Sequence, residues 1–190
     1  MSHPWPSEPE IALLAPVTTV AQAAAAAAAG AGLVDAGDDG ALVPAIRRAV
    51  SGVRVCGVHE DADLVRDAAL AARTGAALIC LGPDAAEAAL RGGIAAGRIL
   101  VQAAPAGIEA AVRAGWPVLA DLERVADLER VADLADSARL ARIEAVAAVC
   151  AWLGASMLRT RHVAGVRHCA DMTESILGRR PPAWAVRGLA

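Results

Sequence analysis

Three cationic or titratable side chains follow one apolar run of the sequence. In GASMLRTRHVAGVRHC, residues 154–169, the run ends in Arg159, Arg161 and His162, and a helical pattern follows. Guanidinium groups hold phosphate and carboxylate groups through paired hydrogen bonds, so two of them at a strand end predict an anion-binding corner. The chemistry indicated is the binding of a phosphorylated or carboxylated small molecule.

Polar side chains also stand at the ends of other apolar runs, namely Asp35, His59 with Glu60, Gln102 and Asp121. His59 beside Glu60 is a candidate catalytic general base, because the ordinary pKa of an imidazole lies near neutral pH. Asp35, His59 and His162 are residue types that bind metals, but no spacing such as HExxH joins them, so no metal site is expected. For each residue the alternative is a charge that is simply solvated at a strand end.

The composition excludes several classes of chemistry. The 190 residues include no Lys, Asn, Phe or Tyr, which rules out a lysine Schiff base, a P-loop lysine and a catalytic tyrosine. The net charge is −3 and the aromatic content is 2%. Neither a basic track nor stacking platforms are present, so nucleic acid is not an expected partner.

The apolar N-terminal region does not predict a membrane span. The uncharged run 11–34 contains Pro16, Thr18, Thr19 and Gln22 among weakly apolar alanines, and the residues before it are acidic rather than basic. The four cysteines have no CxxC spacing, and nothing requires an oxidising compartment. We therefore expect a soluble cytoplasmic protein with no membrane partner.

Short apolar runs alternate with alanine-rich helical patterns such as residues 61–75. Seven candidate strands cover residues 11–15, 32–37, 53–58, 77–82, 98–103, 117–122 and 156–161. Regular β-α alternation with continuously apolar strands predicts a parallel sheet buried on both faces. We expect one domain, an α/β TIM-like (β/α) barrel shortened to about seven recognisable strands, with tails at 1–10 and 179–190. An open doubly wound parallel sheet is the alternative.

One segment breaks the alternation. Residues 120–134, ADLERVADLERVADL, form a six-residue repeat, and more than 30 residues separate the last two candidate strands. A surface helix or helix pair is one interpretation of the segment 121–153. The other is a packing face for a second copy of the chain or for a partner protein.

The last third of the sequence resembles the closing segment of dihydropteroate synthases. Residues 154–172, GASMLRTRHVAGVRHCADM, are similar to a last strand of the form GAxxxRVHDV that leads into the final helix. Similar pieces occur in the right order: GAGLVDAG for GADIIDIGG, VRVCGVHEDADLVRDAAL for the SIDT strand and its helix, GGIAAGRILVQAAP for GIxxxRIxLDPG, and WPVLADLERV for PVLVGLSRK. The resemblance covers most of the chain.

Dihydropteroate synthases are (β/α)₈ barrels, commonly dimeric, that condense a dihydropterin pyrophosphate with p-aminobenzoate, usually with magnesium. The resemblance therefore implies a small anionic or pterin-like ligand and makes Mg²⁺ the cofactor to consider. It places Asp35, Arg124 and Arg159 on the corresponding residues of the family motifs. The anion-binding candidates are then Arg159, Arg161, Asp35, Gln102 and Arg124.

Most other functional positions depart from the family pattern. Asp38 and Asp39 replace a serine and a threonine and would repel a pyrophosphate. The third-strand aspartate falls at His59, the LDPG aspartate at Gln102 and the SRK lysine at Val125. The resemblance also places the fourth-strand asparagine near Cys80 or Leu81, and the strand before LDPG is interpreted as deleted, which would account for the missing eighth strand.

These departures predict a dihydropteroate synthase-like protein, related to folate biosynthesis, that lacks synthase activity. Such a protein would bind an anion, or would bind a second copy or a partner through residues 121–153. One alternative is an enzyme of altered chemistry on a small phosphorylated or carboxylated substrate, with His59 and Glu60 as its catalytic residues. Retained synthase activity is the other, and the missing lysine opposes it most directly.

Overall fold

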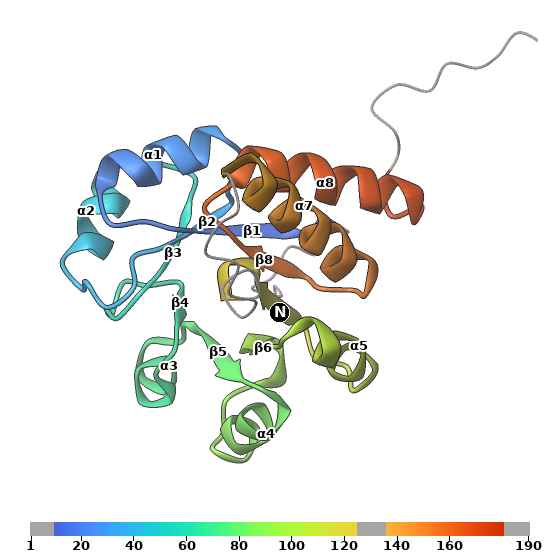
Figure 1. Cartoon of the computed structure of the whole chain (residues 1–190). Coiled ribbons are helices and arrows are strands. Elements are labelled where there is room, and N and C mark those ends of the chain that lie inside the picture. The colour runs from blue at the N-terminus through green and yellow to red at the C-terminus, as the bar shows by residue number, and fades with distance from the viewer. Residues whose placement is uncertain (1–9, 125–135, 181–190) are drawn as a thin grey trace, which may run out of the picture.

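A computed structural model describes residues 10–124 and 136–180. Eight parallel strands close into a barrel in chain order, with β8 paired to β1 (Figure 1). The strands are β1 Ala12–Pro16, β2 Leu33–Asp35, β3 Arg54–Cys56, β4 Leu64–Val65, β5 Ala77–Leu81, β6 Ile99–Gln102, β7 Val118–Asp121 and β8 Met157–Arg159. The fold is the predicted TIM-like barrel, and the open-sheet alternative is wrong.

Helices surround the barrel (Figure 1). They are α1 Val20–Ala28, α2 Leu42–Ala49, α3 Ala68–Thr74, α4 Pro83–Arg91, the 3-10 helix η1 Ala96–Arg98, α5 Pro105–Arg113, α7 Asp136–Trp152 and α8 Val163–Ile176. Thr19 caps α1 and Asp67 caps α3, because the side chain of each accepts a hydrogen bond from a backbone N–H of the first turn. Pro83 and Pro105 start α4 and α5 at the position where a missing N–H costs nothing.

Two apolar layers hold the barrel together. One contains alternate strand residues and fills the inside of the barrel: Ala12, Leu14, Leu33, Cys56, Leu64, Ala77, Ile79, Leu100, Leu119 and Met157. The other joins the outward strand residues to the inner faces of the helices. Successive side chains of a strand point to opposite faces, so a continuously apolar strand supplies both layers.

The eighth strand lies where the sequence predicted a helix. Residues 61–75 were expected to be helical throughout, but Leu64 and Val65 form β4 and α3 begins only at Ala68. The strand between 77 and 81 is therefore the fifth, and the expectation that a later strand is deleted is wrong. A strand of two residues is too short to show the two-residue alternation of apolar side chains that identifies a strand. Because an alanine-rich helix follows almost directly, the sequence pattern there indicated a helix instead.

What is shortened is the connection between β3 and β4. Residues 57–63 contain no helix, although parallel neighbours are usually joined by a helical crossover. Arg47 of α2 pairs with Asp63 at 2.8 Å, and Asp63 also accepts a hydrogen bond from the backbone N–H of Val55. Gly57 lies so close to α2 that a Cβ there would come within 2.8 Å of Val43. The α2 helix therefore packs directly against the connection between β3 and β4.

Part of the chain on which sequence interpretations depend lies outside the described residues. This applies to 125–135, most of the six-residue repeat, and to 1–9 and 181–190 of the expected tails. The later part of the long segment forms α7, which packs along α8 (Figure 1). None of the helices in the described ranges combines the length and apolar composition that crossing a membrane requires.

The barrel interior provides a test of the fold. Replacing Leu100, which is fully buried inside the barrel, by Ala leaves a cavity. We expect this to lower the free energy of unfolding by about 2–5 kcal/mol in urea denaturation. Leu81→Ala is the control, because that side chain is 70% exposed and its loss should change stability by no more than about 0.5 kcal/mol. Equal effects of the two changes would contradict the observed packing.

Candidate functional site

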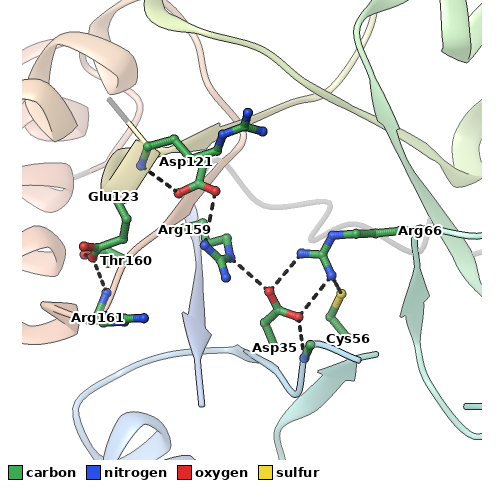
Figure 2. A network of polar contacts seen from close by, with 10 residues as sticks. Asp35, Cys56, Arg66, Asp121, Glu123, Arg159, Thr160 and Arg161 are labelled. Atoms are coloured by element: carbon green, nitrogen blue, oxygen red, sulfur yellow. Dashed lines mark hydrogen bonds and ion pairs between the residues drawn. The ribbon is translucent and has the colours of Figure 1, made fainter. Parts of the chain in front are cut away.

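Four charged side chains meet at the carboxyl ends of the strands and form what we call the mouth network: Asp35, Arg66, Asp121 and Arg159 (Figure 2). Arg66 grips Asp35 with two hydrogen bonds, Nη1 to Oδ1 at 3.1 Å and Nη2 to Oδ2 at 2.8 Å. Arg159 donates from Nε to Asp35 Oδ2 at 2.9 Å and from Nη1 to Asp121 Oδ2 at 3.1 Å. Each carboxylate thus has an arginine partner, and Arg159 joins the two carboxylates.

Strand register explains why residues so far apart in sequence converge. Asp121 and Arg159 are direct partners on the neighbouring strands β7 and β8. Leu14 of β1 is the partner of both Arg159 on one side and Leu33 on the other. Asp35 follows Leu33 by two residues and therefore points to the same face of the sheet. All three side chains are consequently directed into the mouth of the barrel.

The mouth network is electrically balanced and mostly buried. The side chains of Asp35, Asp121 and Arg159 are 1%, 9% and 22% exposed. Burial alone would raise the pKa of Asp35, but the hydrogen bonds and charge of Arg66, the charge of Arg159 and the N–H of Gly37 hold that pKa below its ordinary value. Asp35 is therefore ionised at neutral pH, and the two carboxylates cancel the two guanidinium charges.

Cys56 lies beside this network as a buried thiol. Its Sγ is 3.5 Å from Nη1 of Arg66 (Figure 2). Burial, reinforced by the charge of Asp35, raises the pKa of Cys56 to about 12. The thiolate is the nucleophilic form of cysteine, so this thiol is not equipped for nucleophilic attack near neutral pH.

A second set of contacts fixes the turn between β8 and α8. Oε1 of Glu123 accepts hydrogen bonds from the backbone N–H of Arg161 at 2.8 Å and from the hydroxyl of Thr160 at 3.4 Å (Figure 2). The same hydroxyl accepts a hydrogen bond from the N–H of His162 at 3.0 Å. These bonds hold Arg161 and His162 at the start of α8.

A cleft of about 1040 Å³ opens beside the mouth network. Its lining includes Arg159, Arg161, His162 and the first turn of α8, together with the acidic pair Asp38 and Asp39. The guanidinium of Arg161 is exposed in this cleft and has no ion-pair partner among residues 10–124 and 136–180. Arg161 is therefore the cation of the site whose charge is not neutralised by a described carboxylate.

The side chains of the remaining predicted site residues neither line the cleft nor join the ion pairs of the mouth network. Gln102 ends β6 and is half-buried, and Arg124 is exposed just after β7, where its backbone N–H donates to Asp121. His59 accepts a hydrogen bond from the N–H of Asp61 in its own loop. Neither His59 nor Glu60 lines the cleft or contacts the mouth network. Arg66 was missed, because it was placed inside the expected helix 61–75.

Known proteins resemble this chain in sequence and in fold. No protein-family model matches the chain. The chain is 35% identical over 83 residues to the inactive dihydropteroate synthase 2 of Mycobacterium leprae, a match that covers 44% of this chain and 28% of the relative. It therefore spans little more than a quarter of the length of that relative.

Two solved structures match nearly the whole chain. The structure of Mycobacterium tuberculosis Rv1207 has a TM-score of 0.71 and 23% identity, covering 93% of this chain and 96% of that one. The Yersinia pestis dihydropteroate synthase has a TM-score of 0.76 and 16% identity, covering 89% and 93%. In sequence the chain is similar to an inactive dihydropteroate synthase 2 over less than half of its length, and in fold it is similar to a dihydropteroate synthase over nearly all of it.

Two acidic groups of the chain stand at positions where the motif PVLVGLSRK has none. Aligned with WPVLADLERV, Asp121 falls on the glycine and Glu123 on the serine. Asp121 binds the side chain of Arg159, and Glu123 binds the backbone of Arg161. Both acids therefore form hydrogen bonds to arginines at the end of β8 or directly after it.

The strand count corrects one correspondence within the dihydropteroate synthase-like barrel. The fourth-strand asparagine of the motif was expected near Cys80 or Leu81, but those residues end β5. The residue directly after the fourth strand is Arg66. The residue that follows the fourth strand of this chain is therefore an arginine, whose guanidinium grips Asp35.

The described residues do not suit the magnesium ion that the resemblance implies. Asp35 and Asp121 are already engaged by arginines. Within the described ranges, no three His, Cys, Asp or Glu side chains gather in a way that could hold a metal. Hard cations need several free oxygen ligands, and this mouth does not offer them.

The mouth network predicts a pH-dependent loss of stability. Asp35→Asn leaves Arg66 and Arg159 without their shared charge and should lower the free energy of unfolding by about 3–5 kcal/mol at pH 7. Because the pKa of Asp35 is lowered in the folded state, its contribution is complete above the ordinary aspartate value of about 4 and is lost as the pH falls through the folded-state value.

Urea denaturation of both proteins across this pH range measures the effect. The difference between wild type and Asp35→Asn should shrink in acid. Asp38→Asn, an exposed change in the same loop, is the matched control and should stay within about 0.5 kcal/mol of wild type. A difference that is independent of pH would contradict the assigned ionisation of Asp35.

Proposed function

We propose that this chain is a non-catalytic dihydropteroate synthase-like protein that binds a small anion weakly in the cleft beside Arg161. The observation that carries the proposal is that Arg159 is bound by two carboxylates of its own chain, Asp35 and Asp121. A guanidinium neutralised in this way has little electrostatic attraction left for a substrate anion. The absence of every lysine and asparagine from the sequence supports the same conclusion.

The curated relative supports the absence of catalysis, since it is named an inactive dihydropteroate synthase 2. A link to folate biosynthesis is part of the same proposal and rests on this similarity. The buried free thiols Cys56, Cys80 and Cys150 suit a reducing compartment, so we also propose a cytoplasmic location.

The charge of the cleft indicates which anions it accepts. Arg161 and the positive end of α8 attract an anion, because the first turn of a helix presents unpaired N–H groups. Asp38 and Asp39 on the same cleft repel one, and they do so most strongly for a highly charged group such as pyrophosphate. The site therefore favours a singly charged phosphate ester or a carboxylate, bound weakly.

Calorimetric titration with dihydropterin pyrophosphate and with pyrophosphate alone tests the proposal. We expect equal, weak binding of the two, loss of that binding in Arg161→Ala, and no turnover with p-aminobenzoate. Arg124→Ala is the matched control, because Arg124 is exposed one strand away but does not line the cleft. Much tighter binding of the pterin compound, or turnover, would overturn the proposal.

A second candidate function is assembly through the segment 121–153. Its described part, α7, exposes Val149 at 53% and Trp152 at 58%, and large apolar side chains exposed near one another are typical of interfaces. The adjoining helix α8 exposes Met172 and Ile176. We propose that this face binds a second copy of the chain or a partner protein.

Sedimentation of the purified chain tests this second candidate. Trp152→Glu should shift the protein toward a monomer, because a charge in an apolar interface must be desolvated without a partner. Leu90→Glu is the control, since Leu90 is 44% exposed on α4, on another part of the barrel. A monomeric wild-type chain would leave only a different protein as the partner, and an unchanged dimer in Trp152→Glu would move the interface elsewhere.

A further inference from the structure

We infer that the carboxylate of Asp121 pairs with the guanidinium of Arg159 in place of an external anion. It thereby keeps small anions from an inner binding site, which we place at Arg159 in the barrel mouth. The inference rests on the proposed function in one respect, namely that the cleft admits small anions. It goes further by assigning a residue that keeps them from Arg159. The ligand class of the closed site is an oxyanion of the size of phosphate or a carboxylate.

The geometry leaves Arg159 accessible but neutralised. Its side chain is 22% exposed and lines the cleft together with Arg161. A guanidinium has five N–H donors, and the mouth network uses Nε for Asp35 and Nη1 for Asp121. N–H donors therefore remain on Nη1 and Nη2, and a carboxylate or phosphate can accept two hydrogen bonds from such a pair. What the site lacks is net positive charge.

Of the two carboxylates, Asp121 is the one that can be removed without breaking the network. Asp35 is held by both Arg66 and Arg159, so its loss would leave two buried cations unpaired. The mouth network pairs Asp121 only with Arg159, and the other hydrogen bond of Asp121 within the described residues is a weak one from the N–H of Arg124 at 3.4 Å. Replacing Asp121 by Asn keeps the shape and gives the network a single positive charge.

The test is calorimetric titration of inorganic phosphate into wild type and Asp121→Asn. We expect binding to the variant to be tighter by roughly tenfold or more, the range of one charge-assisted hydrogen bond. The double variant Asp121→Asn/Arg159→Gln should lose this gain. Glu109→Gln is the matched control, because it removes an exposed carboxylate on α5 that pairs with Arg113 and does not line the cleft, and its affinity should stay within about threefold of wild type.

Two further measurements cover a variant that folds poorly. Asp121→Gly makes the same change in charge by removing the side chain altogether, and it should show the same gain in phosphate affinity. In either variant, phosphate should raise the unfolding temperature by more than in wild type, because a ligand that binds only the folded state stabilises it. Unchanged affinity in both variants, or a gain that persists without Arg159, overturns the inference.

The outcomes separate this inference from the proposed function. If Arg161→Ala binds anions as well as wild type does, the proposed anion site beside Arg161 is wrong. An Arg159-dependent gain in Asp121→Asn would still support the inner site at Arg159. If Arg161→Ala abolishes binding and Asp121→Asn behaves as wild type, only the inner site is wrong.

Discussion

The barrel mouth depends on the need of one buried carboxylate for cationic partners. Asp35 is almost completely removed from solvent, and an ionised group in that position is tolerated only when it is paired and hydrogen-bonded. Arg66 and Arg159 reach it from opposite sides of the mouth, from the end of β4 and from β8. Arg159 then carries a second carboxylate, Asp121. The ends of four strands, β2, β4, β7 and β8, are thereby joined by ion pairs that all depend on Asp35 or on its partner Arg159.

This linkage explains how a barrel can retain its architecture while its chemistry changes. The layer of apolar side chains inside the barrel consists of other residues than the mouth network and supplies packing stability of its own. The mouth can therefore exchange ligand-binding groups for internal ion pairs without loss of the fold. A site that satisfies its own charges needs no ligand to hold its arginines and carboxylates in place.

The sequence predicted the barrel and placed three of the four mouth residues at strand ends, for reasons that individual residues make clear. Asp35, Asp121 and Arg159 were placed there because each ends an apolar run, and parallel strands bring such ends together. Arg66 was hidden, because a strand of two residues merges with the helical pattern after it. The pairing itself could not be foreseen: Arg159 and Asp35 are 124 positions apart, and Arg159 and Asp121 are 38 apart. Only the register of the closed sheet makes them neighbours.

The short connection between β3 and β4 also has a consequence for how the chain folds. Cys56 and Leu64 form a strand pair across a loop of a few residues, whereas the pairing of Ala12 with Met157 joins the two ends of the barrel. The entropy lost on closing a loop grows with its length, so the β3–β4 pair is the least costly strand pair to close, and the β1–β8 pair is the most costly. The missing helix therefore makes one strand contact local in a barrel whose closure is otherwise a long-range event.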